Sequence, residues 1–307
     1  MSHPDEQKDL TAEAIKQKEE RAKQAVQAYI ALEDVIAQIK DLPTISTVAQ
    51  ELMSHLDDEQ CSLETICEKV SLDQSLAAKT LRLANSSYYG ANSKVVTIQQ
   101  AVSMLGITNV KNLIRLTIIA EHFQGEVCAG FDFKSFWRHS VATAICAELI
   151  SRHLHMKHDF AFTAGLLHDI GRLVLVTRFP KEYEAVLNYQ KQNDCPLLNA
   201  ERAILNTDHV IAGFILAMHW QFSDAIQDAI RGHHQPDEPG LNSIASIIHV
   251  ANSIVHGLDL TQSTNANNDM VPDICQSAWD SLALAEADYH AIFKETSLRF
   301  EGIDQIV

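Results

Sequence analysis

Apolar residues recur every three or four positions along most of the chain, which is the period of a helix with one buried face. This pattern predicts helices near residues 136–154, 160–175, 180–192, 197–205, 208–219, 223–232, 243–257 and 277–298. A looser form of it marks residues 10–40, and a denser helical region begins at Leu42-Pro43. We find no strand-like alternation, so we expect an all-α protein.

Short polar motifs indicate where some of these helices begin and end. Ser71-x-x-Gln74 and Thr97-x-x-Gln100 have the spacing of a capping box, whose first side chain accepts a hydrogen bond from the helix backbone. Gly106 follows the apolar Leu105 and is expected to end a helix.

Breaks in the helical pattern divide the chain into four parts. Residues 1–40 are expected to form a helical extension, and residues 41–126 a smaller N-terminal helical subdomain. A second helical bundle is expected over residues 127–260. A polar loop and a C-terminal helix are expected within residues 261–307.

Composition and charge limit the classes of function. Of the 307 residues, 46% are apolar, which suffices for a large core, and the formal charge of −16 disfavours a nucleic-acid surface. No uncharged apolar stretch reaches the roughly 18 residues of a membrane span. The six cysteines form no C-x-x-C pair and no signal peptide is recognisable. We therefore expect reduced thiols in a cytoplasmic protein.

Six residues of metal-ligand type lie on or at the ends of the predicted helices. They are His139, His168, Asp169, His209, His233 and His234. A buried imidazole needs a partner for each ring nitrogen, so histidines without a task are not favoured at inward positions. Imidazoles and one carboxylate gathered from several helices are what a bundle uses to hold a borderline transition metal.

The neighbours of these residues support an inward-facing site. His168 and Asp169 are consecutive on the predicted helix 160–175, about 100° apart around its axis, so both can reach one site. Gly165 would let a second helix approach closely. His209 is followed by the small residues Ala212, Gly213 and Ala217, and His233-His234 follows Gly232 at an expected helix C-terminus, where a cation is favoured.

The other histidines are expected to be capped or core residues. They are His153, His155, His158, His219, His249, His256 and His290.

Several longer motifs resemble those of the HD superfamily of metal-dependent phosphohydrolases, and more closely its HDOD (HD-related output domain) branch. The resemblance covers roughly residues 40–260. It rests on Leu42-Pro43-Thr44, SLDQSLAAKTLRLANSSYYG at 71–90, IQQAVSMLGI at 98–107, FWRHSVATA at 136–144, AGLLHDIG at 164–171, Glu201-Arg202 and His233-His234. It implies an HD-like helical bundle preceded by a smaller helical subdomain, and a role in bacterial signalling or regulation.

The resemblance also implies a ligand set. The metal-binding positions of catalytic HD proteins fall on His139, His168, Asp169, His209, His233 and His234, and the implied metal is one or two ions of Fe, Mn or Zn. Their late aspartate is replaced by Asn252, whose neutral amide oxygen is a poorer ligand. The Gly-Tyr-Pro motif that follows the double histidine in the branch hydrolysing cyclic di-GMP is absent, which disfavours that substrate.

Three interpretations remain open from the sequence. The first is a non-catalytic signalling module with a partly retained metal site, whose partners are other signalling proteins. The second is a phosphohydrolase acting on a nucleotide or phosphate ester, in which Asp169 bridges the ions or orients the attacking hydroxide. Candidate phosphate contacts are then Lys111, Arg115, Arg172 and Arg231. The third is a histidine cluster that binds no metal.

Overall fold

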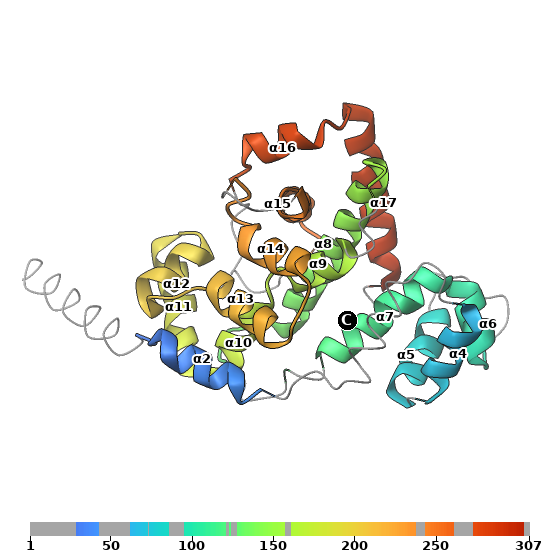
Figure 1. The fold of residues 1–307 in the computed structure, drawn as a ribbon, viewed down its shortest axis with the longest axis horizontal. Helices are drawn as coiled ribbons and strands as arrows, with labels where there is room; N and C mark the ends of the chain where they lie inside the picture. The colour runs from blue at the N-terminus through green and yellow to red at the C-terminus, as the bar shows by residue number, and fades with distance from the viewer. Residues whose placement is uncertain are drawn as a thin grey trace, which may run out of the picture.

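The computed structural model describes residues 29–42, 62–72, 74–85, 95–120, 123, 128–156, 161–237, 243–260 and 273–303. Every regular element within these ranges is a helix, which confirms the predicted all-α class (Figure 1). The parts of the predicted extension before residue 29 and of the predicted loop at 261–272 lie outside the described residues.

Four helices form the N-terminal subdomain, at one end of the molecule in Figure 1. They are α4 (Leu63–Leu72), α5 (Gln74–Ala84), α6 (Ile98–Leu105) and α7 (Ile107–Ala120). Thr97 caps α6 by accepting a hydrogen bond from the Gln100 N–H, and Gly106 ends it with φ of 78°, both as predicted. Ser71 was wrongly predicted to be a cap, because it lies inside α4 and its hydroxyl donates to the Cys67 carbonyl.

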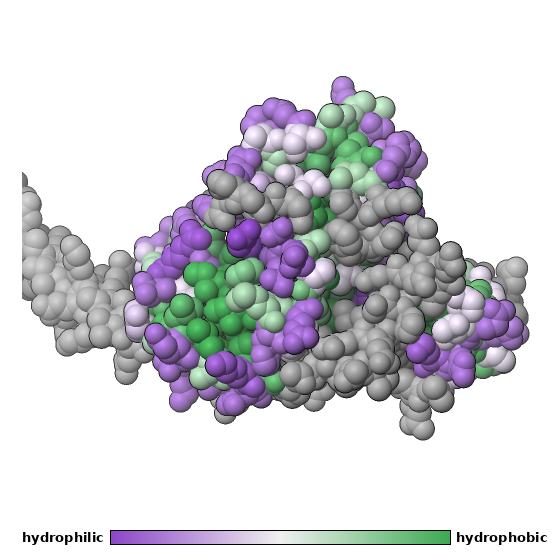
Figure 2. Space-filling view, in the orientation of Figure 1, coloured by the Kyte–Doolittle hydropathy of each residue, from purple (hydrophilic) through white to green (hydrophobic). Residues whose placement is uncertain are grey.

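Helix α2 (Leu32–Lys40) packs against α13 (His209–His219), at the opposite end of the molecule from α4 to α6 in Figure 1. The Ile30 N–H donates to the Leu205 carbonyl at 3.1 Å, and Val35 and Ile39 are buried. Figure 2 shows an apolar area over this region, where Ile211 and Met218 of α13 are 41% and 46% exposed.

The histidine-bearing bundle is built around α8 (Phe133–His153), which packs against α9, α15 and α17. Its other helices include α11 (Pro180–Asn193), α12 (Leu197–Leu205), α14 (Asp224–Gly232) and α15 (Ser243–Gly257). Their bounds agree with the predicted ranges to within about one residue, because apolar periodicity and flanking Pro, Asp and Gly residues mark them clearly.

The predicted single helix over residues 160–175 is wrong. The chain forms α9 (Ala161–Leu167) and α10 (Ile170–Arg178), and His168 and Asp169 make the turn between them. The His168 ring donates to the Gly165 carbonyl at 2.7 Å. A side chain that donates to a nearby backbone carbonyl competes with the hydrogen bonds of the helix backbone. Such bonds are typical of helix ends.

Glycines allow backbones to approach closely on both sides of this turn. A Cβ on Gly165 would lie 2.7 Å from the Ala144 Cα of α8. A Cβ on Gly171 would overlap the His209 carbonyl oxygen and lie 2.5 Å from the Gly213 N of α13. Because glycine has no side chain, the helices that carry the predicted ligands can pack backbone against backbone at these two positions.

The C-terminal region also differs from the prediction of one helix over 277–298. It forms α16 (Gln276–Leu282) and α17 (Glu286–Ile303), since Ala283 adopts a left-handed conformation with φ of 48° that ends α16. The Trp279 and Tyr289 rings of the two helices stack with centroids 4.2 Å apart.

None of the described helices is by itself long and apolar enough to cross a membrane; only the pair Ile98–Leu105 and Asn109–Ala120, which is bent by 110°, meets the length and composition criteria jointly.

The contact at Gly171 predicts a large effect of one methyl group. Gly171→Ala is expected to lower the free energy of unfolding by about 3 kcal/mol, because two backbones would have to separate. Gly257→Ala is the matched control, since a Cβ there meets nothing within 4 Å and φ is not positive. It should leave stability within about 1 kcal/mol of the unaltered protein. Urea denaturation measures both, and equal stabilities would contradict the close packing described here.

Candidate metal centre

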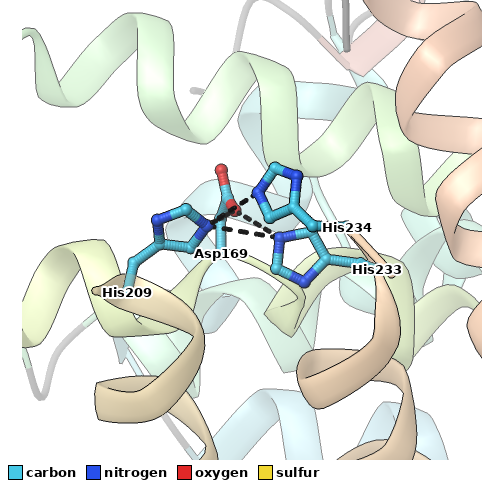
Figure 3. A group of neighbouring side chains, drawn as sticks. All are labelled: Asp169, His209, His233 and His234. Atoms are coloured by element: carbon cyan, nitrogen blue, oxygen red, sulfur yellow. Dashed lines mark hydrogen bonds and ion pairs between the residues drawn. The ribbon is translucent and has the colours of Figure 1, made fainter. Parts of the chain in front are cut away.

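The structure brings all six predicted histidine and aspartate ligands together in two groups that share Asp169. The first group is Asp169, His209, His233 and His234, and the second is His139, His168 and Asp169. Within each group, one ligand atom per residue lies within 4.8 Å of the others. Figure 3 shows the first group, with His209 on one side of the carboxylate and the double histidine on the other.

The Asp169 Oδ1 atom lies near the centre of the cluster. Its distances to the Nε2 atoms of His233, His209 and His168 are 3.3, 3.5 and 3.6 Å. The Nε2 atom of His209 lies 3.3 Å from that of His233 and 3.0 Å from that of His234. Four imidazole nitrogens and a carboxylate oxygen thus converge in a space almost closed to solvent.

Acceptors behind three of the rings fix which nitrogen carries a proton. The Nδ1–H groups of His168 and His233 donate to the carbonyls of Gly165 and Ile230, at 2.7 and 2.8 Å. The His209 Nδ1–H donates to Glu201 Oε2 at 2.6 Å. In the neutral rings, the three Nε2 lone pairs therefore face the Asp169 carboxylate.

Lone pairs that face a buried carboxylate require a cation between them. The His168 Nε2 atom is buried without a hydrogen-bond partner among the described residues. Imidazoles held by hydrogen bonds through their second nitrogen, together with a carboxylate, are the donors that Zn and Fe ions take in proteins. The residues present therefore fit a divalent transition metal ion.

Glu201 of α12 supports the site, a role that the sequence analysis did not assign. It is fully buried, and its Oε2 accepts both from the His209 ring and from the His209 backbone N–H, at 2.6 and 2.9 Å. The Tyr183 hydroxyl donates to the other oxygen at 2.8 Å. In the sequence, Glu201 stood out only as part of the Glu201-Arg202 motif. No local spacing connects Glu201 with His209.

Burial and nearby charges shift the pKa values in opposite directions. Burial would lower the pKa of His209, but the Glu201 carboxylate outweighs it and raises the pKa to about 9. Burial lowers the pKa of His168 to about 4. For Asp169, burial would raise the pKa, yet His168, His233 and His209 together hold it well below its usual range. The carboxylate is thus ionised, and one proton is retained on His209.

His139 Nδ1, in the second group, and Asn252 Oδ1, on α15, are further buried polar atoms that lack a hydrogen-bond partner among the described residues. Asn252 lies on α15 one turn before His256, whose ring packs on His139 with centroids 4.5 Å apart. His256, which was expected to be a capped or core residue, therefore lies beside the second ligand group. Residues four apart share one face of a helix, so Asn252 lies on the same face of α15 as His256.

Arg172 contacts the second oxygen of Asp169. Its NH1 atom lies 3.2 Å from Asp169 Oδ2, and its guanidinium carbon lies 5.8 Å from the ring centroids of both Phe131 and Phe136. The side chain is only 11% exposed, so its charge is held beside the carboxylate rather than in solvent.

The other three predicted phosphate contacts have different surroundings from those of Arg172. Arg231 pairs with Asp228 and lies over the Phe214 ring. Arg115 is buried in α7, where it donates to Asn112. Lys111 also lies on α7, in the N-terminal subdomain.

Two other predicted non-ligand histidines have partners in the fold. The His153 ring bonds to the Leu149 carbonyl, and both ring nitrogens of His249 are used. His290 is 75% exposed near Glu286 and is a surface residue rather than a core residue.

Known proteins resemble this chain in sequence and in fold. The HDOD domain family matches residues 42–236. An uncharacterized protein of Treponema pallidum (strain Nichols) is 23% identical over 227 residues, which cover 72% of this chain and 43% of that protein. The chain spans less than half the length of the curated relatives it matches.

Two solved structures share the fold. A candidate phosphohydrolase from Shewanella amazonensis SB2B is 26% identical, with a TM-score of 0.58 over 86% of this chain and 98% of that chain. A candidate signal transduction protein from Marinobacter aquaeolei VT8 is 22% identical, with a TM-score of 0.71 over 93% of this chain and 64% of that chain.

Removing the charge behind His209 should weaken metal binding. Glu201→Gln is expected to lower the affinity for Zn²⁺ by about 10- to 100-fold, because the ring loses the carboxylate that orients it and increases its basicity. Tyr183→Phe is the milder control, since it keeps both hydrogen bonds that Glu201 accepts from His209. Competition with a chelator measures both affinities. Equal affinities for Glu201→Gln and the unaltered protein would contradict this role.

Metal affinity should also rise with pH. His209 keeps its proton below its pKa of about 9, and an ion at Nε2 must displace it. Because zinc binding releases this one proton, the Zn²⁺ affinity is expected to increase about tenfold per pH unit up to pH 9. In Glu201→Gln the pKa of His209 is no longer raised, so this rise should level off at a lower pH. Zinc titrations between pH 6 and 9 test it, and a flat profile would refute it.

Proposed function

The chain belongs to the HDOD family, and we propose that it is a bacterial signalling module that binds one metal ion and does not catalyse hydrolysis. Its partners are other signalling proteins, as the resemblance to this family implies. The ion is held by Asp169, His209, His233 and His234, and it connects α10, α13 and the turn after α14.

The observation that carries this proposal is the difference in charge between the two ligand groups. The first group combines three imidazoles with Asp169 Oδ1. The family resemblance assigns a further carboxylate to the second group, at the position where this chain has the neutral amide of Asn252. Arg172 lies 3.2 Å from the other oxygen of Asp169. A second divalent ion there would face a fixed positive charge and would lack a compensating negative one.

This asymmetry bears directly on hydrolysis. In two-ion phosphohydrolases the ions stabilise both the attacking and the leaving oxygen, and a shared carboxylate lies between them. When bound, a single ion supplies Lewis acidity and an acidified water. Among the described residues, the second ligand group adds His139 and His168, and burial lowers the pKa values of both. Neither is suited to donate a proton to a leaving group near neutral pH.

A metal-dependent phosphohydrolase remains the second candidate. It is favoured by the two ligand groups sharing one aspartate, and by the likeness to the candidate phosphohydrolase of Shewanella amazonensis. Its substrate would be a nucleotide or a phosphate ester. Turnover of phosphodiesters by the unaltered protein with added Mn²⁺ or Fe²⁺ would decide for this candidate and against our proposal.

Restoring the carboxylate on α15 should change the metal content. Asn252→Asp is expected to raise the number of tightly bound ions from one towards two per chain, because it adds a negative charge to the second group. Asn252→Ala is the control that removes the amide without adding charge, and it should keep one ion. Elemental analysis of protein purified without a nickel column counts the ions. No ion in the unaltered protein, or two, would contradict the proposal.

A further inference from the structure

His249 bridges the double histidine and the C-terminal segment. Its Nδ1 lies 2.7 Å from the His233 carbonyl oxygen, and its Nε2 accepts from the Cys275 backbone N–H at 2.8 Å. A carbonyl only accepts and an amide N–H only donates, so both bonds require the neutral ring with its proton on Nδ1. The side chain of His249 is therefore fully used, between two backbone groups 42 residues apart in sequence.

The carbonyl that His249 contacts belongs to the peptide group joining His233 and His234. This peptide lies just past the end of α14, where the helix no longer fixes the backbone. Because the peptide is planar, its orientation sets the directions in which the two side chains leave the backbone. A donor on its oxygen therefore holds both imidazoles of the first ligand group.

The other end of the bridge belongs to a packed segment. Cys275 is the N-cap residue of α16, whose Ala278 and Leu282 are buried, and α16 packs along α15 (Figure 1). Asp237, four residues after His233, accepts from the Cys275 thiol at 2.9 Å and from the Ser277 hydroxyl at 2.5 Å. The segment thus contacts the double-histidine turn at two places.

We propose that His249 is a positioning residue through which residues 273–282 hold the His233-His234 peptide in its metal-binding orientation. The inference rests on the proposed metal binding at these histidines. His249 and α16 lie outside residues 42–236, the range that the family model matches. A partner that displaces α16 would loosen the ligands and weaken metal binding, which connects a surface helix with the buried site.

Two substitutions of Cys275 isolate the bond to His249. Cys275 has φ of −69°, which proline adopts without strain, and as N-cap residue it needs no N–H for the helix. Cys275→Pro removes the N–H that His249 accepts, whereas Cys275→Ala keeps it. Both remove the thiol contact with Asp237, so they differ in the bond of interest.

The expected result is that Cys275→Pro binds Zn²⁺ about 10-fold more weakly than Cys275→Ala. His249→Asn should resemble Cys275→Pro, because an amide near the Nδ1 position still donates to His233. His249→Leu removes both bonds and should lose about 100-fold. Equal zinc affinities for Cys275→Pro and Cys275→Ala would overturn the proposal.

Amide hydrogen exchange of the metal-free protein separates this inference from the proposed function. Exchange at the amides of residues 233–235 and 237 should be at least about fivefold faster in Cys275→Pro than in Cys275→Ala, since the turn loses its support. If the unaltered protein binds no zinc, the proposed function fails. The exchange rates of Cys275→Pro and Cys275→Ala then test by themselves whether His249 positions the turn. Equal exchange rates would then refute the positioning role.

Discussion

The buried Asp169 Oδ1 atom, with imidazole nitrogens at 3.3 to 3.6 Å, is the constraint on which this site depends. The second nitrogen of each of these rings is committed to an acceptor, so the rings cannot turn their protons towards the carboxylate without breaking a buried hydrogen bond. A cation has to lie among them. In the metal-free protein the proton on His209 serves this purpose, and in the function proposed above a divalent ion replaces it.

Such convergence requires helices to approach more closely than ordinary side chains allow. Gly165 sets α9 directly on the backbone of α8, and Gly171 sets α10 on the first turn of α13. The turn that carries His168 and Asp169 lies between these two contacts, so its geometry is determined by backbone packing on both sides. The stability of the core and the geometry of the site therefore have the same origin, and a methyl group at either glycine disturbs both.

Sequence patterns predicted the helices and the ligand types, because periodicity and residue chemistry are local signals. They failed where the deciding feature leaves no mark on these patterns. The apolar period runs through residues 160–175 without a break, and only the bond from the His168 ring to Gly165 reveals the turn. Glu201 and His256 were not recognised as neighbours of the site, since packing of separate helices brings them to it. The break at Ala283 carries no glycine or proline signal.

In the function proposed above, the asymmetry between the two ligand groups gives the site a structural role in signalling. An ion among Asp169, His209, His233 and His234 joins the start of α10, the start of α13 and the end of α14, which are elements far apart in sequence. Because a metal site forms only when its ligands are in place, binding at such a junction stabilises one arrangement of the helices. His249 extends this connection to α16 at the surface. A change in the position of α16 and a change in metal occupancy are then thermodynamically coupled, and each must alter the other by the same factor.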